Sequence, residues 1–418
     1  MALSLKSSSI LTENHLVGID IGSEKTAVAV ALPGANGGFE ILGLSTVPTA
    51  GLKAGALTSI PELSGTIEKA VIEAESLSGR SIQQVHLSLF GDYFRPLKRQ
   101  GETEIRNRQG EVNEGDRQTV IRKALPSVSS EFEIIHTIVQ EYFLDDQRQI
   151  TNPIDMSGEH LGVGLFVISA ATTNLKNIRR CVQEINLEVQ SVSFSPLVGA
   201  EAVLTQEEID SGVAYLEMGR SAATLLVFQP KLREVEMVGR GGERLTYALA
   251  YVLKTGMAEA ERIKREYGTC LTDVENQEIP IANVHGEMRQ PTSRREVAEI
   301  IEAEVKDLLV PFDSVLKKNR PLLTSGLVLG GGGVNLSGLP EFLEEELDMP
   351  VRIGTARQFH GWEKNWKSPA YNAVLGAVQS AWAKQEEEKN GSAHKKTAVG
   401  RAVHRSMNFW RSIWRDFF

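Results

Sequence analysis

L-V-G-I-D-I-G-S-E-K-T-A-V-A-V, residues 16–30, places two apolar runs on either side of the tight turn Asp20-Ile21-Gly22-Ser23. This pattern predicts a strand-turn-strand hairpin with a carboxylate and a hydroxyl at its bend. Gly22 lets the backbone approach a phosphate, Ser23 can donate a hydrogen bond to one, and Asp20 can hold Mg²⁺ through water. An ordinary hairpin turn is the alternative, since short glycine motifs occur in many proteins.

The same pattern returns at residues 212–228, G-V-A-Y-L-E-M-G-R-S-A-A-T-L-L-V-F. Strand, acid, glycine turn and strand follow in the same order, with Glu217 and Gly219 at the bend. An internal duplication predicts two similar halves that face each other across a cleft, each offering a glycine turn to the same phosphates.

Two further segments extend the expected site. Residues 326–333, G-L-V-L-G-G-G-G, form an apolar strand that runs into four glycines, which allow a planar or charged ligand to approach the backbone closely. Residues 239–242, G-R-G-G, open a helical run through Lys264. Glu261 and Lys264 lie one turn apart on one face of that run, where a solvated surface pair is the alternative to a ligand site.

Length and composition limit the class of protein. A chain of 418 residues is too long to fold around a single hydrophobic core, so two or more domains are expected. Its composition of 41% apolar and 24% charged residues is ordinary for a soluble globular protein. Cys181 and Cys270 lack metal-ligand spacing, which predicts buried structural thiols in a reducing cytosol. No apolar run reaches the roughly 18 residues of a spanning helix. The net charge of -9 argues against nucleic-acid binding.

The pattern along the chain predicts an α/β layer that is interrupted once. Strands at 39–47 and 85–90 and a helix around 67–77 begin the layer, and helices at 175–185 and 296–316 follow later. Between them, residues 90–169 read as a small inserted subdomain of different character. Its expected elements are a helix at 116–124 and strands at 134–138, 141–144 and 163–168.

The end of the chain is predicted to differ from the rest. Residues 384–398 are polar and typical of a flexible linker. Residues 399–418 then predict an amphipathic helix that lies in an anionic membrane surface, although docking on the protein's own body or on a partner is the alternative. Its expected membrane-binding residues are Met407, Trp410, Ile413, Trp414, Phe417 and Phe418 on the apolar face, with Arg405, Arg411 and Arg415 as the basic residues.

Together these motifs resemble the actin, Hsp70 and sugar-kinase superfamily and, within it, the FtsA family of bacterial cell-division proteins. The resemblance covers most of residues 14–418 and implies an α/β, actin-like ATPase fold with two lobes. Its most specific stretches are 16–25, Gln140-Glu141-Tyr142, Asn152-Pro153, Met156-Ser157-Gly158, 196–205, 258–264, 326–339 and 369–376.

The resemblance also implies a division into subdomains. Subdomain 1A would comprise 14–89, 170–192 and 357–383; the insertion at 90–169 would be subdomain 1C; subdomain 2A would comprise 193–246 and 311–356; and subdomain 2B would be 247–310.

FtsA proteins bind ATP between their lobes, polymerise on the inner membrane, hold the C-terminal tail of FtsZ in subdomain 2B and recruit later division proteins. The resemblance therefore implies ATP and Mg²⁺ as cofactors, a location at the division site on the cytoplasmic face, and a scaffold with slow or absent hydrolysis. Arg294 and Arg295 are candidates for FtsZ binding, and Asp20 is the candidate for the metal. The implied nucleotide-binding residues are Asp20, Gly22, Ser23, Lys25, Glu217, Gly219, Gly241, Gly242, Glu261, Lys264, Gly331, Gly332, Gly333 and Val334.

The second phosphate turn departs from the family pattern. The family usually has D-I-G-G-G-T-x-D where residues 217–224 read E-M-G-R-S-A-A-T. Arg220 puts a bulky side chain where glycine lets the backbone reach a phosphate, although its guanidinium can pair with a phosphate instead. Glu304 is a second departure, because many relatives have a basic residue there.

Two other functions remain as alternatives. A pilus-assembly protein of the PilM type shares the insertion and lacks the terminal amphipathic helix. A sugar-kinase-like phosphotransferase shares the fold but needs a general base beside a substrate pocket.

Overall fold

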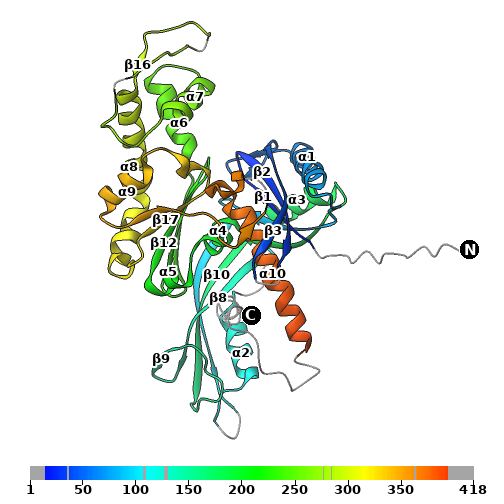
Figure 1. Cartoon of the computed structure of the whole chain (residues 1–418). Coiled ribbons are helices and arrows are strands. Elements are labelled where there is room, and N and C mark those ends of the chain that lie inside the picture. Colours follow the sequence, from blue (N-terminus) through cyan, green and yellow to red (C-terminus); the bar gives the residue numbers. More distant parts are fainter. Residues whose placement is uncertain are drawn as a thin grey trace, which may run out of the picture.

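A computed structural model describes residues 15–34, 37–106, 110–126, 130–275, 277–283, 285–361 and 364–393, without the side chains of 364, 365 and 387–393. The predicted helix at 399–418 and its nine membrane-binding residues lie outside these ranges. The chain forms two lobes, with an insert extending from the first lobe (Figure 1).

The first lobe is built on a sheet of six strands that contains the opening hairpin. The two strands of the hairpin, residues 16–21 and 25–33, pair antiparallel. The strand at residues 84–89 lies beside residues 16–21 and runs parallel to them. Alternate residues of the hairpin face two different helical layers, which explains why nearly all of them are buried. In spatial order the strands are β11 (Glu188–Phe194), β6 (Gln84–Leu89), β1 (Leu16–Ile21), β2 (Lys25–Pro33), β3 (Phe39–Pro48) and β19 (Phe359–His360).

The second lobe repeats this arrangement, as the duplicated sequence pattern predicts. The two strands of its hairpin, residues 213–218 and 223–228, are again antiparallel. The strand at residues 327–330 lies beside residues 213–218 and again runs parallel to them. The two turns close in the same way, because the amide of Gly22 donates to the oxygen of Lys25 at 3.0 Å and that of Gly219 to the oxygen of Ala222 at 2.9 Å. In spatial order the strands are β14 (Leu232–Val238), β13 (Ala223–Phe228), β12 (Val213–Met218), β17 (Leu327–Gly330) and β18 (Val351–Ile353).

Helices cover both faces of the first sheet. α1 (Ile60–Ser78) and α3 (Thr172–Gln183) pack on one face, while α4 (Ser195–Val203) and α10 (Asn372–Ala393) lie on the other. α4 and α10 cross closely, since a Cβ atom on Gly376 would stand 2.0 Å from the carbonyl oxygen of Val198. The last ten residues of α10 fall in the segment for which the sequence predicts a linker.

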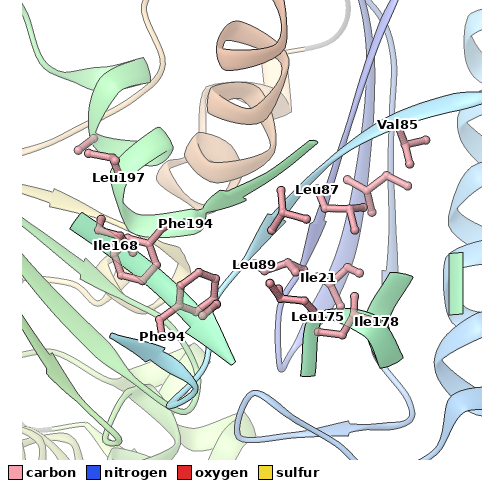
Figure 2. Packing of buried hydrophobic residues seen from close by; sticks show 14 of the residues in the cluster. Ile21, Val85, Leu87, Leu89, Phe94, Ile168, Leu175, Ile178, Phe194 and Leu197 are labelled. Carbon is pink, nitrogen blue, oxygen red and sulfur yellow. The ribbon is translucent and has the colours of Figure 1, made fainter. Parts of the chain in front are cut away.

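The insert is a four-stranded sheet covered by one helix. Its strands are β7 (Phe94–Glu104), β10 (His160–Ala171), β8 (Phe132–Leu144) and β9 (Gln147–Ile150) in spatial order, and α2 (Glu114–Ala124) packs on them. The core of the first lobe continues into the insert, where the ring centroids of Phe94 and Phe194 lie 5.0 Å apart beside Ile168 (Figure 2).

The sequence prediction for the insert divided one strand into two and missed another. The strands expected at 134–138 and 141–144 are one strand, β8, with an irregularity where Leu165 pairs with Val139 and Gly164 with Glu141. This bulge breaks the alternation of apolar residues and makes one strand read as two. β7 was not predicted, because it lies at the edge of the sheet and most of its side chains are polar and at least partly exposed.

The remaining elements belong mainly to the second lobe. A single helical run was expected to reach Lys264, but the chain breaks after α6 (Gly242–Val252), with Lys254 at φ 50°, before α7 (Met257–Tyr267) begins. α8 (Arg294–Asn319) is longer than the predicted helix. The other elements are α5 (Gln206–Ser211), α9 (Leu339–Leu347), β15 (Glu278–Ile279), β16 (Thr292–Ser293), the small hairpin β4 (Leu52–Lys53) and β5 (Ala56–Leu57), and 3₁₀ turns η1 (Arg320–Leu322), η2 (Gly332–Asn335), η3 (Lys364–Lys367) and η4 (Pro369–Tyr371).

Candidate functional site

A cleft of about 1110 Å³ lies between the two lobes, and both hairpin turns open into it. It is lined by the predicted residues Asp20, Gly22, Ser23, Lys25, Glu217, Gly219, Gly242, Glu261, Lys264, Gly331, Gly332 and Gly333. Gly241 and Val334 of the predicted set are not part of this lining. The fold thus brings together segments that are more than 300 residues apart in the chain.

Two carboxylates stand at equivalent positions at the base of the cleft. Asp20 pairs with Ala27 across the first hairpin, as Glu217 pairs with Thr224 across the second. The hydroxyl of Ser195, the first residue of α4, donates to Asp20 Oδ1 at 3.2 Å, and the hydroxyl of Tyr215 donates to Glu217 at 3.5 Å.

Burial raises the pKa of both carboxyl groups. The pKa of Glu217 rises to about 8, first because it is desolvated and then because the charge of Asp20 lies nearby. Such a pair of acids fits a hydrated divalent cation, which would neutralise their repulsion. Within the described residues, no group of three or more His, Cys, Asp or Glu side chains is arranged to hold a metal ion.

Lys25 lies beside the first turn, and its amine is largely buried against an aromatic ring. Its Nζ atom stands 3.6 Å from the centroid of the Tyr371 ring. Burial lowers the pKa of Lys25 to about 8, while Asp20 and Glu24 oppose the shift. An anion entering the cleft would favour the charged form of this amine.

The two turns touch each other directly. The Ser221 hydroxyl donates to Ser23 Oγ at 2.9 Å, and Ser23 also accepts from the amide of Gly55 at 3.2 Å. Arg220 does not stand free beside them: its guanidinium pairs with Glu24 of the first lobe and with Glu243 at 2.9 Å. The position that departs from the family pattern therefore carries a contact between the lobes.

Gly241 and Gly242 shape the second turn. The amide of Gly242 donates to the oxygen of Gly219 at 2.9 Å. Gly241 sits so tightly against the turn that a Cβ atom would stand 2.5 Å from the same oxygen, which explains the glycine. Gly241 lines a smaller hollow of about 310 Å³ instead.

Glu261 and Lys264 are paired to each other and to α6. Lys264 Nζ lies 2.6 Å from Glu261 and donates to the oxygen of Gly242 at 3.0 Å and to Thr246 at 2.8 Å. Burial of Glu261 is outweighed by hydrogen bonds from Lys264, Thr246 and Arg265, which lower its pKa to about 2. This pair fixes α6 against α7 at the wall of the cleft.

The glycines after β17 form the opposite wall. Gly331 has φ 84°, a conformation that favours glycine, and a Cβ atom there would stand 2.5 Å from the Met218 oxygen. Val334 is fully buried in the core of the second lobe instead of facing the cleft, because η2 turns its side chain inward. The bare glycine backbone at this wall fits the flat base of a nucleotide.

The two candidate arginines on α8 lie in different settings. Arg294 lines the cleft, and its buried Nε atom has no hydrogen-bond partner among the described residues, whereas Arg295 pairs on the surface with Glu299 at 3.1 Å. Glu304, the second departure, pairs with Arg244 on α6 at 2.9 Å.

Sequence reasoning missed several cleft residues. Glu24, Ser195, Arg265 and Asn335 all line the cleft. Glu24 lies between Ser23 and Lys25 of the predicted turn, so its position in the sequence was a signal for it. Ser195 and Arg265 carry no motif, and only the fold brings them to the turns.

Among the residues that the structure describes, no helix is long and apolar enough to cross a membrane.

Comparisons with known protein families match two segments of the chain, one in the insert and one that covers most of the second lobe. The family described as "Cell division protein FtsA" matches residues 214–376, and the "SHS2 domain inserted in FTSA" matches residues 91–169. The cell division protein FtsA of Pseudomonas aeruginosa is 28% identical over 386 residues, covering 91% of this chain and 92% of its own. That of Escherichia coli strain K12 is 26% identical over 408 residues, covering 94% and 95%.

Solved structures agree on the fold. A PilM-PilN type IV pilus biogenesis complex aligns with a TM-score of 0.66 at 16% identity, covering 88% of this chain and 98% of that one. MreB5 of Spiroplasma citri bound to ADP aligns with a TM-score of 0.53 at 11% identity, covering 91% and 98%. The fold is thus the two-lobed actin-like fold with an inserted subdomain, and the chain belongs to the FtsA family of cell-division proteins.

Proposed function

We propose that this protein is an actin-like scaffold that tethers FtsZ filaments to the cytoplasmic face of the inner membrane at the division site. The observation that carries the proposal is the pair of glycine turns facing one cleft in a chain whose terminal sequence is amphipathic. In this role it binds ATP with Mg²⁺, self-assembles into filaments on the membrane and helps to recruit later division proteins, with slow or absent hydrolysis.

The nucleotide would lie across the cleft. The base would rest against Gly331–Gly333, and the phosphates would reach toward Gly22 and Gly219, with Mg²⁺ near Asp20. Arg220 supports slow turnover, because it replaces a glycine whose bare backbone would otherwise approach the phosphates.

Attachment to the membrane would come from residues 399–418. Two tryptophans, Trp410 and Trp414, lie on the apolar face of the expected helix, and basic residues favour anionic lipid. Anchoring through many copies of a filament would strengthen this reversible contact.

The test of the tether is sedimentation with vesicles that contain anionic lipid. We expect the full chain to sediment, and the chain lacking 399–418 to remain in solution. The full-length variant Trp410→Glu/Trp414→Glu should also stay in solution, while Lys395→Gln, outside the helix, should sediment normally. Sedimentation of the shortened chain at the wild-type level would contradict the proposed role of residues 399–418 as the membrane tether.

The FtsZ contact is tested separately. A peptide with the sequence of the FtsZ C-terminal tail should bind the full chain, and Arg295→Ala should weaken binding if the surface of α8 takes part. Arg294→Ala reports on the cleft side of the same helix. Equal binding by wild type and both variants would remove these two arginines from the proposed contact.

A further inference from the structure

One carboxylate joins the two lobes at the phosphate turns. Glu24 lies in the turn between β1 and β2 and accepts hydrogen bonds from two arginines of the second lobe. Arg220 of the second turn bonds one oxygen of Glu24, and Arg265 on α7 bonds the other at 3.0 Å. Glu24 therefore contacts two different elements of the second lobe at once.

The same two arginines are held by carboxylates of their own lobe. Arg220 donates to Glu243 at 2.9 Å, and Arg265 donates to Glu261 at 2.6 Å. These supports aim both guanidinium groups at a common point, which Glu24 now occupies. The arrangement is a prepared site for an oxyanion, since guanidinium groups bind carboxylate and phosphate with the same geometry.

The contact between Glu24 and the two arginines lies inside the cleft, where a ligand would bind. Glu24, Arg220 and Arg265 line the cleft together with the hydroxyls of Ser23 and Ser221, which bond each other at 2.9 Å. The two turns thus meet through the chain's own side chains inside the cleft.

We propose that Arg220 and Arg265 form a subsite for the terminal phosphate of a polyphosphate ligand, and that the Glu24 carboxylate fills this subsite when the ligand is absent. Glu24 then acts as an internal anion that keeps the lobes together without nucleotide. Only the identity of the competing ligand, a nucleoside triphosphate, rests on the proposed function.

Competition follows from the charges. A polyphosphate must displace Glu24, because both anions need the same two guanidinium groups. Removing the charge of Glu24 should therefore tighten binding, by about tenfold if the carboxylate is the main competitor. The gain should require Arg220 and Arg265, since they bind the phosphate that replaces Glu24.

The test uses the full chain and three probes, namely inorganic tripolyphosphate, Mg·ATP and adenosine, with binding measured by calorimetry. Glu24→Gln should bind tripolyphosphate about tenfold more tightly than wild type. The gain should disappear in Glu24→Gln/Arg220→Gln and in Glu24→Gln/Arg265→Gln. The matched control is Asp313→Asn, which breaks an ion pair with Lys317 within α8 and should bind like wild type.

The outcomes separate this inference from the proposed function. If Glu24→Gln binds tripolyphosphate no more tightly than wild type while its thermal unfolding remains cooperative, the subsite is refuted. If the expected pattern holds for tripolyphosphate while neither Mg·ATP nor adenosine binds to any variant, the subsite stands and the nucleotide proposal falls.

A distance measurement tests the contact between the lobes directly and does not depend on affinity. Spin labels at Ile72 on α1 and Tyr251 on α6, which are 58% and 85% exposed, report on the two lobes. The distance distribution should widen in Glu24→Gln and narrow again with saturating tripolyphosphate. An unchanged distribution in Glu24→Gln would overturn the role of Glu24 in joining the lobes.

Discussion

Glu217 occupies on β12 the position that Asp20 occupies on β1, one methylene group further from its strand. Each lies two residues before its turn glycine, and each pairs across its hairpin at the same register. The longer side chain brings the Glu217 carboxylate against α4, where a Cβ atom on Gly199 would stand 2.9 Å from it. The duplicated acid thus lies against a helix that links the two lobes.

We predict that stability depends on pH through Glu217. Its folded pKa of about 8 lies above the ordinary value, so folding takes up a proton. The stabilisation is complete below the ordinary glutamate pKa and is lost as the pH rises to about 8. Glu217→Gln should be more stable than wild type at pH 8, by roughly 2 kcal/mol, and similar at pH 5.

Thermal unfolding midpoints of both proteins across this pH range check the prediction. Glu201 on α4, whose pKa burial also raises to about 8, acts in the same direction, so Glu201→Gln should flatten a further part of the curve. An equal loss of stability in Glu217→Gln at pH 5 and pH 8 would contradict the proton uptake.

Glu208 should give the opposite slope. It accepts from the amide of Thr205 at 2.8 Å and forms two bonds with Arg352 at 2.7 and 2.8 Å. These bonds outweigh burial and lower its pKa, so its stabilisation is present above the ordinary pKa and is lost as the pH falls through the folded value. Glu208→Gln should cost about 1–2 kcal/mol at pH 7 and less near pH 3.

Chemical denaturation at the two pH values measures this cost. Glu207→Gln, an exposed neighbour on α5, is the control and should change stability little. A cost for Glu208→Gln that does not shrink in acid would show that packing, and not charge, is responsible.

The crossing of α4 and α10 should not tolerate a side chain at Gly376. A Cβ atom there would stand 2.0 Å from the Val198 oxygen, a backbone atom that cannot rotate away. Gly376→Ala should cost roughly 3 kcal/mol, measured by urea unfolding. Gly65→Ala on α1 should instead gain roughly 0.5–1 kcal/mol, because a Cβ atom there would meet no described atom within 4 Å beyond its chain neighbours and its own helix backbone. A small effect at Gly376 would mean that the two helices shift easily.

Both cysteines should be unreactive in the folded protein. Cys181 and Cys270 are buried, and burial raises the pKa of both thiols, that of Cys270 to about 12. A thiol reagent at pH 8 should modify neither within minutes and should modify both in denaturant. Rapid modification of the native chain would reveal local opening around α3 or the segment after α7.

Features with a local signal were predictable from sequence. The two hairpins were found because apolar strands and turn glycines lie close together in the chain, and their matching registers confirm the duplication. The insert was recognised by its change of composition. β7 was missed because a charged edge strand has no apolar alternation, and β8 was split because a bulge interrupts its period.

Features that depend on distant contacts were not predictable. Arg265 and Glu24 are 241 positions apart and meet only because α7 packs over the first turn. Arg220 was correctly singled out as unusual, yet its partners could not be read from its neighbours in the chain. The predicted role of Val334 did not foresee that a 3₁₀ turn would direct its side chain into the core.

The way in which the insert joins the first lobe has a consequence for how such proteins change over evolutionary time. The chain enters through β7 and leaves through β10, and these strands are paired from the start, with Phe94 opposite Ala170. Its entrance and exit therefore lie side by side, so the piece can be gained, lost or exchanged in a single event without rerouting the rest of the chain. The two-lobed body and the insert can therefore change independently of each other.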